Sequence, residues 1–306
     1  MADSKEIAFQ NDIIAALQAS GWLVGESTHY DAERTLYPDD LIDYVRVTQP
    51  KALDTLAKHY PDPGQALVKA VAKARDKRGT LSVLRHEVKD LGARIRCCTF
   101  RPDHGLNPEL SARYAANRLR VVPEVTYSPH GASGRLDLVL FVNGIAVATL
   151  ELKSAFKQSL EQAKRQYMFD RPPVDPTTKK PEPLLAFNTG ALVHFAVSQY
   201  EVAMTTKLAG ADTFFLPFNR GTADQGAGND QPAAGYATRY LWDEVFQPDN
   251  WLNILGRYVH LEESWSEDAR GRKRKKQTLI FPRYHQWDAV RRLIATAGGE
   301  GPGHKY

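Results

Sequence analysis

Two apolar, β-prone segments joined by Asn143-Gly144 constrain the fold of this chain more than any other feature. The segments, 136–142 and 145–152, are nearly continuous runs of apolar residues. Asn-Gly is the dipeptide that best fits a tight type I′ turn, so the sequence predicts a β-hairpin here. Continuous apolar strands are typical of strands covered on both faces, and we therefore expect this hairpin inside a sheet.

Three charged residues interrupt these apolar segments. Asp137 lies in the first segment, Glu151 lies at the end of the second, and Lys153 directly follows it. Because strand side chains alternate, Glu151 and Lys153 project from one face while Leu152 points into the core. The hairpin is long enough to carry Asp137 and Glu151 to a common edge. Two carboxylates beside a lysine indicate a hard-cation site suited to metal-dependent phosphodiester cleavage.

The spacing alone fits a second interpretation equally well, in which these residues are solvated side chains at strand ends. The flanking apolar runs favour the metal site. Charges that end a buried strand would be costly without a partner or a cation.

Composition sets broad limits on the class of protein. With 306 residues, 42% of them hydrophobic and 25% charged, the chain fits two soluble globular domains or one large one. A net charge of +4 is too small to indicate nucleic-acid binding. Adjacent Cys97 and Cys98 give neither metal-ligand spacing nor a disulfide framework. Since we also find no membrane-length apolar run and no signal peptide, we expect a cytoplasmic protein without a membrane partner.

Hydrophobic periodicity divides the chain into three regions. The first predicts helices, beginning with one that starts at an Asp3–Glu6 capping box and ends at Gly21. The middle region, about 95–205, predicts strands over 121–127, 136–142, 145–152 and 184–187, a hairpin over 194–205, and a helix over 154–170. Segment 219–238 reads as a loop, and helices return from 240. This order predicts an α/β fold with a mixed central sheet flanked by helices.

The acid, hairpin and Glu-x-Lys unit resembles the core of PD-(D/E)xK nucleases. Longer strings resemble the restriction (R) subunit of type I restriction-modification enzymes, from about residue 9 onward; they cover 127–128, 136–144, 151–153, 191–197, 204–210 and 214–221. The resemblance implies a restriction-endonuclease-like core, double-stranded DNA as substrate and Mg²⁺ as cofactor. It also implies methyltransferase and specificity subunits as partners in a prokaryotic cytoplasm. The chain departs from the motif at Leu136, where the family name implies proline.

The resemblance implies roles for the residues of the hairpin. Asp137, Glu151 and the carbonyl of Leu152 would bind Mg²⁺, and Lys153 would contact the scissile phosphate or position the attacking water. Two further acids are supporting candidates: Glu6 on the first helix and Glu124 on the preceding strand. For Glu124 we favour a solvated strand residue.

Related nucleases often carry Gln-x-x-x-Tyr on the helix after the lysine, to hold DNA or orient the site. The nearest match here is Gln162 and Tyr167, one residue too far apart. At 100° per residue, five steps place these side chains on different faces of a helix. We keep both as candidate site residues, and favour core packing for Tyr167.

R subunits of this family continue into two helicase-like motor domains that bind ATP. The chain has no Gly-x-x-x-x-Gly-Lys-Ser/Thr loop. We therefore expect a fragment with an endonuclease domain over 1–245, its catalytic core at about 110–205, and a helical linker leading to the motor over 246–306. Gln286 resembles a glutamine that contacts adenine in such motors, although an exposed glutamine at a helix start fits equally well.

The basic run 270–276 has two interpretations: it tracks a DNA backbone, or it is a solvated loop insertion between helices, which we favour. Two other functions also remain open. One is a stand-alone or repair PD-(D/E)xK nuclease. The other is a non-catalytic docking module of the restriction complex.

Overall fold

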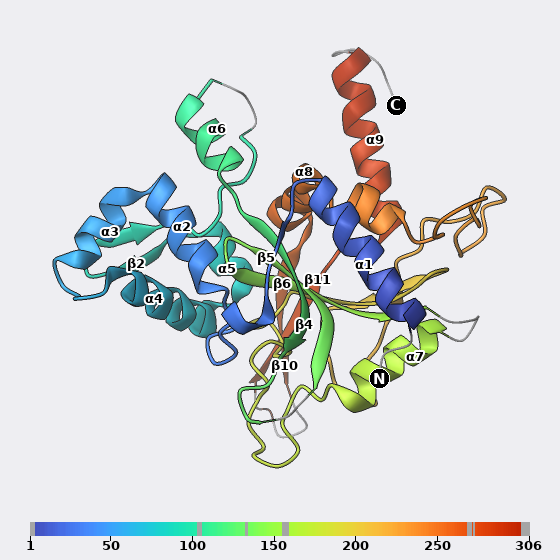
Figure 1. The fold of residues 1–306 in the computed structure, drawn as a ribbon, viewed down its shortest axis with the longest axis horizontal. Helices are drawn as coiled ribbons and strands as arrows, with labels where there is room; N and C mark the ends of the chain where they lie inside the picture. Colours follow the sequence, from blue (N-terminus) through green and yellow to red (C-terminus); the bar gives the residue numbers. More distant parts are fainter. Residues whose placement is uncertain are drawn as a thin grey trace.

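The chain folds around a seven-stranded mixed sheet in the order β1-β4-β5-β6-β7-β8-β9 (Figure 1). The computed structural model describes residues 4–102, 106–131, 134–154, 159–267, 271 and 273–300. The strands are β1 Leu23–Val24, β4 Leu119–Thr126, β5 Arg135–Val142, β6 Ile145–Lys153, β7 Val193–Ser198, β8 Val202–Thr205 and β9 Leu216–Pro217. Strand β4 runs parallel to β1 and β6 parallel to β7, whereas the other neighbours are antiparallel. The predicted mixed sheet is confirmed.

The Asn-Gly turn joins β5 to β6 as predicted. Asn143 has φ 48° and Gly144 has φ 78°, the two positive values that a type I′ turn requires. Asn143 is buried and tied to its surroundings: its Nδ2 donates to the carbonyl of Cys97 at 2.9 Å, and its Oδ1 accepts from the backbone N–H of Arg118 at 2.7 Å. These two hydrogen bonds tie the turn to the backbone of Cys97 and of Arg118.

Helices cover both faces of the sheet, and each face has its own apolar cluster. Helix α1, Ser4–Ala19, buries Phe9, Ile13 and Leu17 in the larger cluster together with alternate residues of β5 and β6. Helix α7, Ser159–Arg165, continues into a π-helical turn, Gln166–Asp170, and packs into the smaller cluster. It lies in the connection between the parallel strands β6 and β7.

The helices that follow β1 form a lobe at one end of the sheet (Figure 1). Its elements are the 3₁₀ turn Ser27–His29, α2 Pro38–Thr48, α3 Pro50–Ala57, α4 Pro63–Arg78, α5 Thr80–Arg85, and the two-stranded sheet of β2 Val88–Asp90 and β3 Ala93–Ile95. Helix α6, Pro108–Ala115, precedes β4. The predicted N-terminal helices are confirmed, although Asp3 of the expected capping box lies outside the described residues.

The strand predicted over 184–187 is wrong, because this segment forms turns. Local hydrogen bonds close it, from Leu185 N to the Glu182 carbonyl at 3.0 Å and from Gly190 N to the Ala186 carbonyl at 2.8 Å. Leu184 and Leu185 are nevertheless buried against the smaller cluster. Their apolar character thus reflects a loop that covers the core.

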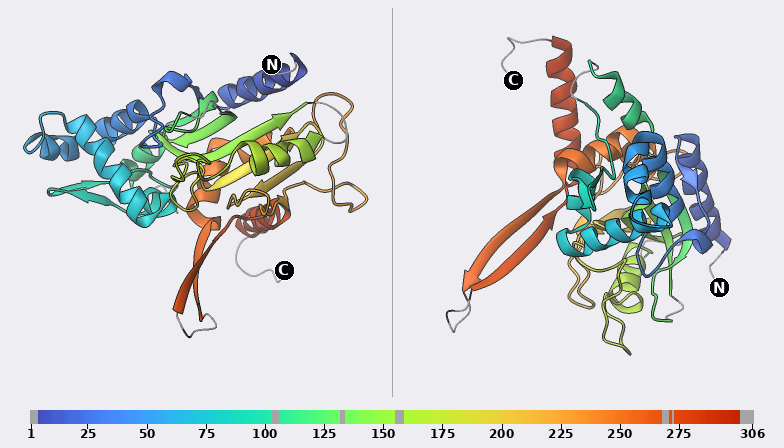
Figure 2. Two further views of the ribbon diagram at one scale, coloured as in Figure 1. Left: turned by 90° about the horizontal axis from the view of Figure 1, so that it is seen from below. Right: turned by 90° about the vertical axis from the view of Figure 1, so that its left-hand side faces the viewer.

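The expectation of a helical C-terminal segment is wrong for residues 260–267 and 273–280. Helices occur at α8 Pro248–Asn253 and α9 Tyr284–Glu300, with π-helical turns at Leu241–Val245 and Ile254–Tyr258. Between them, β10 His260–Glu267 and β11 Lys273–Ile280 form a hairpin that projects from the body (Figure 2). Leu261 pairs with Leu279 at its base, and Lys275 Nζ lies 2.6 Å from Glu263 Oε1 across the strands. Cross-strand pairing of this kind stabilises strands over helix.

The basic run contributes to this hairpin instead of forming a loop between helices. Lys273, Lys275 and Lys276 lie in β11, whereas Arg270 and Arg272 lie outside the described residues. Apolar residues on either side of the hairpin join the larger cluster, where Phe281 lies 5.9 Å from Phe195 between ring centroids. The predicted boundary at 245/246 therefore coincides with no break in the apolar core, and the division into domains stays a prediction.

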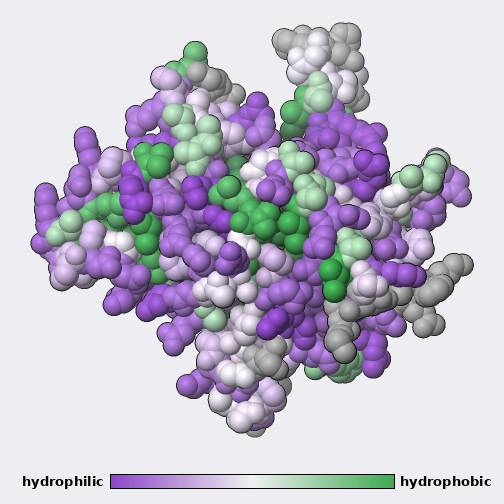
Figure 3. All heavy atoms as spheres, viewed as in Figure 1, coloured by the Kyte–Doolittle hydropathy of each residue, from purple (hydrophilic) through white to green (hydrophobic). Residues whose placement is uncertain are grey.

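Polar side chains dominate the face seen in Figure 3, where apolar ones gather near its centre. Among the described residues, no helix combines the length and apolar character needed to cross a membrane.

The tight turn gives a test of the fold. A Cβ on Gly144 would lie 2.3 Å from the carbonyl oxygen of Tyr37, and the positive φ disfavours alanine independently. We expect Gly144→Ala to lower the free energy of unfolding by about 2–4 kcal/mol. Urea denaturation measures this. Gly228→Ala is the matched control, since no atom lies within 4 Å of its Cβ position. Equal stability of the two variants would contradict the tight approach.

Candidate functional site

Strands β5 and β6 part at the positions of the predicted acids. Their last registered pair toward this end is Leu138 with Leu150. Beyond it, β5 still pairs with β4 over 135–136, and β6 still pairs with β7 over 151–153. The sheet therefore forks between Asp137 and Glu151. If the register continued, these two residues would lie opposite each other with side chains on the same face.

The Asp137 carboxylate bridges this fork. Its Oδ2 accepts a hydrogen bond from the backbone N–H of Leu152 at 2.6 Å. In a strand, the N–H and C=O of one residue point to the same side, so the Leu152 carbonyl also faces β5. Asp137 is 9% exposed and Glu151 is fully buried. The fork thus gathers two carboxylates and one main-chain carbonyl.

Glu151 has an ionic partner that the sequence did not reveal. Arg171 Nε donates to Glu151 Oε1 at 2.8 Å, and an Arg171 terminal nitrogen donates to the Arg135 carbonyl at 2.6 Å. Arg171 therefore spans the fork from β6 to β5. The second carboxylate oxygen, Glu151 Oε2, is buried without a hydrogen-bond partner. Arg171 directly follows the π-helical turn after α7 and belongs to no motif considered above, so the sequence alone did not indicate it.

Helix α1 supplies two more polar contacts at the fork. Lys153 Nζ lies 3.0 Å from Glu6 Oε1, and Gln10 Nε2 donates to the main-chain oxygen of Asp137 at 3.2 Å. Glu6 and Gln10 are four residues apart and so lie on one side of the helix. Glu6 was predicted from the sequence, whereas Gln10 was not. The sequence feature that could have identified Gln10 is its position next to Phe9, as a polar residue on the apolar side of α1.

Glu124 lies next to the fork, on β4. The neighbouring pairs Pro123 with Leu138 and Val125 with Leu136 put it level with Asp137. Its side chain is exposed, in agreement with the favoured interpretation. Glu124 also has φ 53°, a left-handed conformation that costs glutamate about 1–2 kcal/mol.

The structure separates Gln162 from Tyr167. Gln162 is exposed, whereas Tyr167 is fully buried, with its hydroxyl 2.7 Å from Thr149 Oγ1. The Tyr167 ring also packs edge-on against His194 at 5.7 Å between centroids. This position agrees with core packing of Tyr167.

Gln286 lies at the start of α9, and its side chain is exposed. Its Oε1 accepts from the backbone N–H of Arg283 at 3.0 Å. The side chain thus satisfies a free donor at the helix start, as expected of a capping residue.

Burial dominates the electrostatics of the two acids. It raises the pKa of Asp137 to about 6, although the Leu152 N–H and the Lys153 charge act in the opposite direction. Burial also raises the pKa of Glu151 well above its usual range, and the nearby Asp137 charge adds to this, while Arg171 opposes it. A cation at the fork would relieve the cost of holding both groups ionised.

The donor set at the fork fits a hard divalent cation. Within the described part of the chain, no group of three or more His, Cys, Asp or Glu side chains is arranged to hold a metal. The fork instead combines the Asp137 and Glu151 carboxylates with the Leu152 carbonyl. Mg²⁺ is commonly bound by one or two carboxylates and several waters, and the unpartnered Glu151 Oε2 gives a free ligand oxygen.

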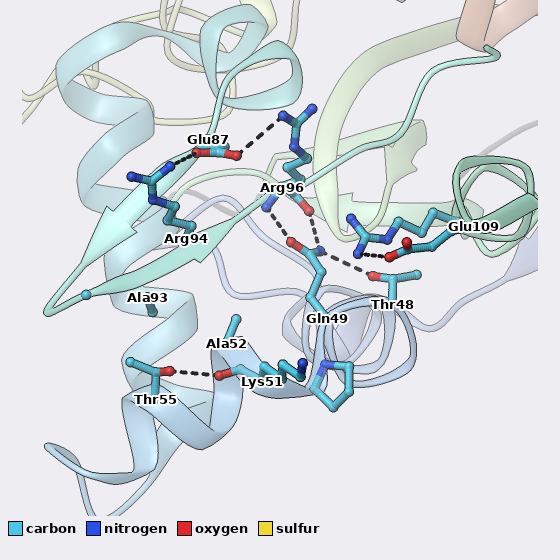
Figure 4. Close-up of a pocket in the computed structure, with 13 residues that line it drawn as sticks. Thr48, Gln49, Lys51, Ala52, Thr55, Glu87, Ala93, Arg94, Arg96 and Glu109 are labelled. Atoms are coloured by element: carbon cyan, nitrogen blue, oxygen red, sulfur yellow. Dashed lines mark hydrogen bonds and ion pairs between the residues drawn. The ribbon is translucent and has the colours of Figure 1, made fainter. Parts of the chain in front are cut away.

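A separate cavity of about 490 Å³ lies in the N-terminal lobe, between α3, the β2–β3 hairpin and α6 (Figure 4). Its arginines have acidic partners within the cavity: Glu87 lies 3.4 Å from Arg96 and 3.9 Å from Arg94, and Glu109 lies 2.6 Å from Arg113. We assign no function to this cavity because each of these arginines is already paired with one of its glutamates.

Comparison with known families gives an assignment. Residues 10–213 match the sequence model described as the type I restriction enzyme R protein N terminus. The chain belongs to this family. The matched range includes both strands of the fork, with Gln10 at its first residue and Arg171 well inside it, whereas Glu6 precedes it. A search of curated proteins found no match to the chain.

Buried His194, beside the fork on β7, provides a pH test. Burial lowers its pKa from 6.5 to about 3, so the unfolded chain binds a proton between these values that the folded chain does not. Acid therefore favours unfolding, and His194 should remove about 1.4 kcal/mol of stability per pH unit below pH 6.5.

Unfolding measured between pH 7.5 and 4.5 checks this prediction. His194→Asn should lose stability at every pH through poorer packing, yet show a shallower decline in acid. Exposed His59→Asn should keep the slope of the unsubstituted chain. A slope unchanged in His194→Asn would rule out this account.

Proposed function

We propose that this chain is the nuclease portion of a type I restriction enzyme, which hydrolyses phosphodiester bonds of double-stranded DNA with Mg²⁺. One observation carries the proposal: the Asp137 carboxylate reaches across the fork to the Leu152 N–H, beside buried Glu151. Both carboxylates thereby gather where β5 and β6 part. Family membership supports the same conclusion.

Each side chain has a definable part in such a reaction. Asp137, Glu151 and the Leu152 carbonyl would hold Mg²⁺, which when bound activates water and stabilises the charge of the transition state. Lys153 is held by Glu6 at 3.0 Å, which keeps its ammonium at the fork for contact with a phosphate oxygen. Gln10 fixes the Asp137 backbone and so steadies the strand end that carries the carboxylate.

The wider assembly follows from the family. We propose that the chain works with methyltransferase and specificity subunits, and that an ATP-driven motor brings DNA to the fork. Gln286, whose Oε1 accepts from the Arg283 N–H, would contact adenine in such a motor.

Substitution in the assembled restriction complex tests the proposal. Asp137→Asn, Glu151→Gln and Lys153→Met should each lower DNA cleavage about 100-fold or more, because each removes a charge required at the reacting phosphate. ATP hydrolysis by the same complexes should persist. The measurements are conversion of circular plasmid to linear product and phosphate release.

Asp54→Asn, an exposed carboxylate on α3, serves as the control and should leave cleavage unchanged. Normal cutting by the three fork variants would disprove the nuclease site. Loss of complex assembly in those variants, with cutting intact when assembly is restored, would instead indicate a docking module.

A further inference from the structure

Arg171 is the most informative group at the fork that the proposed reaction leaves unused. Its side chain is only 12% exposed, and its guanidinium makes contacts to both separated strands. Arginine side chains are rarely buried to this extent unless they are paired. The contact therefore requires an explanation beyond surface charge balance.

Arg171 engages one of the two oxygens with which Glu151 could bind a cation. It donates from Nε to Glu151 Oε1 at 2.8 Å, so one of the two candidate ligand oxygens of Glu151 is already engaged by a positive group. The other, Oε2, is buried and unpartnered. A divalent cation that used both oxygens would have to displace the guanidinium. One that used Oε2 alone would lie close to a fixed positive charge, which repels it.

Arg171 also holds the fork in a particular shape. The 2.6 Å bond to the Arg135 carbonyl attaches it to the start of β5, while Glu151 attaches it to β6. Release from Glu151 therefore frees one strand from the other on this side. Asp137 keeps its separate bond to the Leu152 N–H across the same gap.

We infer that Arg171 and the divalent cation compete for the Glu151 carboxylate, so that Arg171 is a positioning residue that sets the metal affinity of the site. This inference rests on the proposed function. Without a cation, the Arg171 contact holds Glu151 in place. When a cation enters, the guanidinium leaves Glu151 and becomes free to bind an anion such as a DNA phosphate, for which the planar guanidinium is well suited.

Nuclear magnetic resonance of the arginine Nε–H groups tests the competition in the unsubstituted chain. Adding Mg²⁺ should shift or broaden the Arg171 Nε–H signal, which Arg171→Lys assigns by its disappearance. Arg120 is the matched internal control: its Nε donates to buried Asp40 at 2.6 Å, a similar arginine–carboxylate pair outside the fork. Its signal should not move. Asp137→Asn should abolish the Arg171 response.

Metal affinity gives a second measurement. Calorimetric titration with Mn²⁺ should show about 10-fold tighter binding to Arg171→Met than to the unsubstituted chain. Arg165→Met, which removes an exposed arginine at the end of α7, should change binding less than twofold. If Arg171→Met does not fold, Arg171→Gln keeps a hydrogen-bond donor without the charge and should also bind Mn²⁺ more tightly.

The outcomes separate this inference from the proposed function. Mn²⁺ binding that depends on Asp137, with a static Arg171 signal and unchanged affinity in Arg171→Met, overturns the competition and leaves the nuclease site standing. Weaker Mn²⁺ binding in a folded Arg171→Met also overturns it, because Arg171 would then assist the metal. Binding that is absent, or insensitive to Asp137→Asn, overturns the proposed function itself.

Discussion

The hydrogen bond from the Leu152 N–H to Asp137 is the interaction on which the arrangement of the site depends. The pairing of β5 with β6 ends at Leu138 and Leu150, toward Asp137 and Glu151. This separation leaves polar backbone groups without a partner on the neighbouring strand. An unpaired buried N–H costs about 1–3 kcal/mol. Asp137 satisfies this donor at 2.6 Å and keeps the Leu152 carbonyl turned toward the same gap. The separation of the two strands thereby brings a carboxylate and a main-chain carbonyl to the same gap.

The surroundings of the fork show how the fold holds charge in its interior. Glu151 is fully buried, and Arg171 on one side and Lys153 on the other limit the repulsion between it and Asp137. Breaking such a pair leaves an uncompensated buried charge. Helix α1 contributes Glu6 and Gln10 to this arrangement from a segment more than 100 positions away in sequence. The site therefore depends on packing against both faces of the sheet.

Local sequence signals predicted the central elements well where one physical cause dominated. The Asn-Gly turn and the apolar runs of β5 and β6 required the hairpin, because few other conformations suit a dipeptide with two positive φ angles. The same reasoning failed for 184–187, where burial of Leu184 and Leu185 belongs to a loop. It failed again for 260–280, where cross-strand pairs between β10 and β11 decide the structure. Both errors have the same reason: the burial of a residue and its partner on a neighbouring strand depend on parts of the chain outside the segment itself.

The sequence by itself determined the hairpin, the alternation that sets Glu151 and Lys153 apart from Leu152, and the acids that end the strands. These follow from backbone geometry and the period of a strand. Only the tertiary structure decided that the strands part at Asp137 and that Arg171 pairs with Glu151. It also decided that Gln10 and Glu6 of α1 contact the same part of the sheet. Those contacts join residues far apart in the chain. Their energies come from burial and charge proximity, which exist only once the sheet and its covering helices have packed.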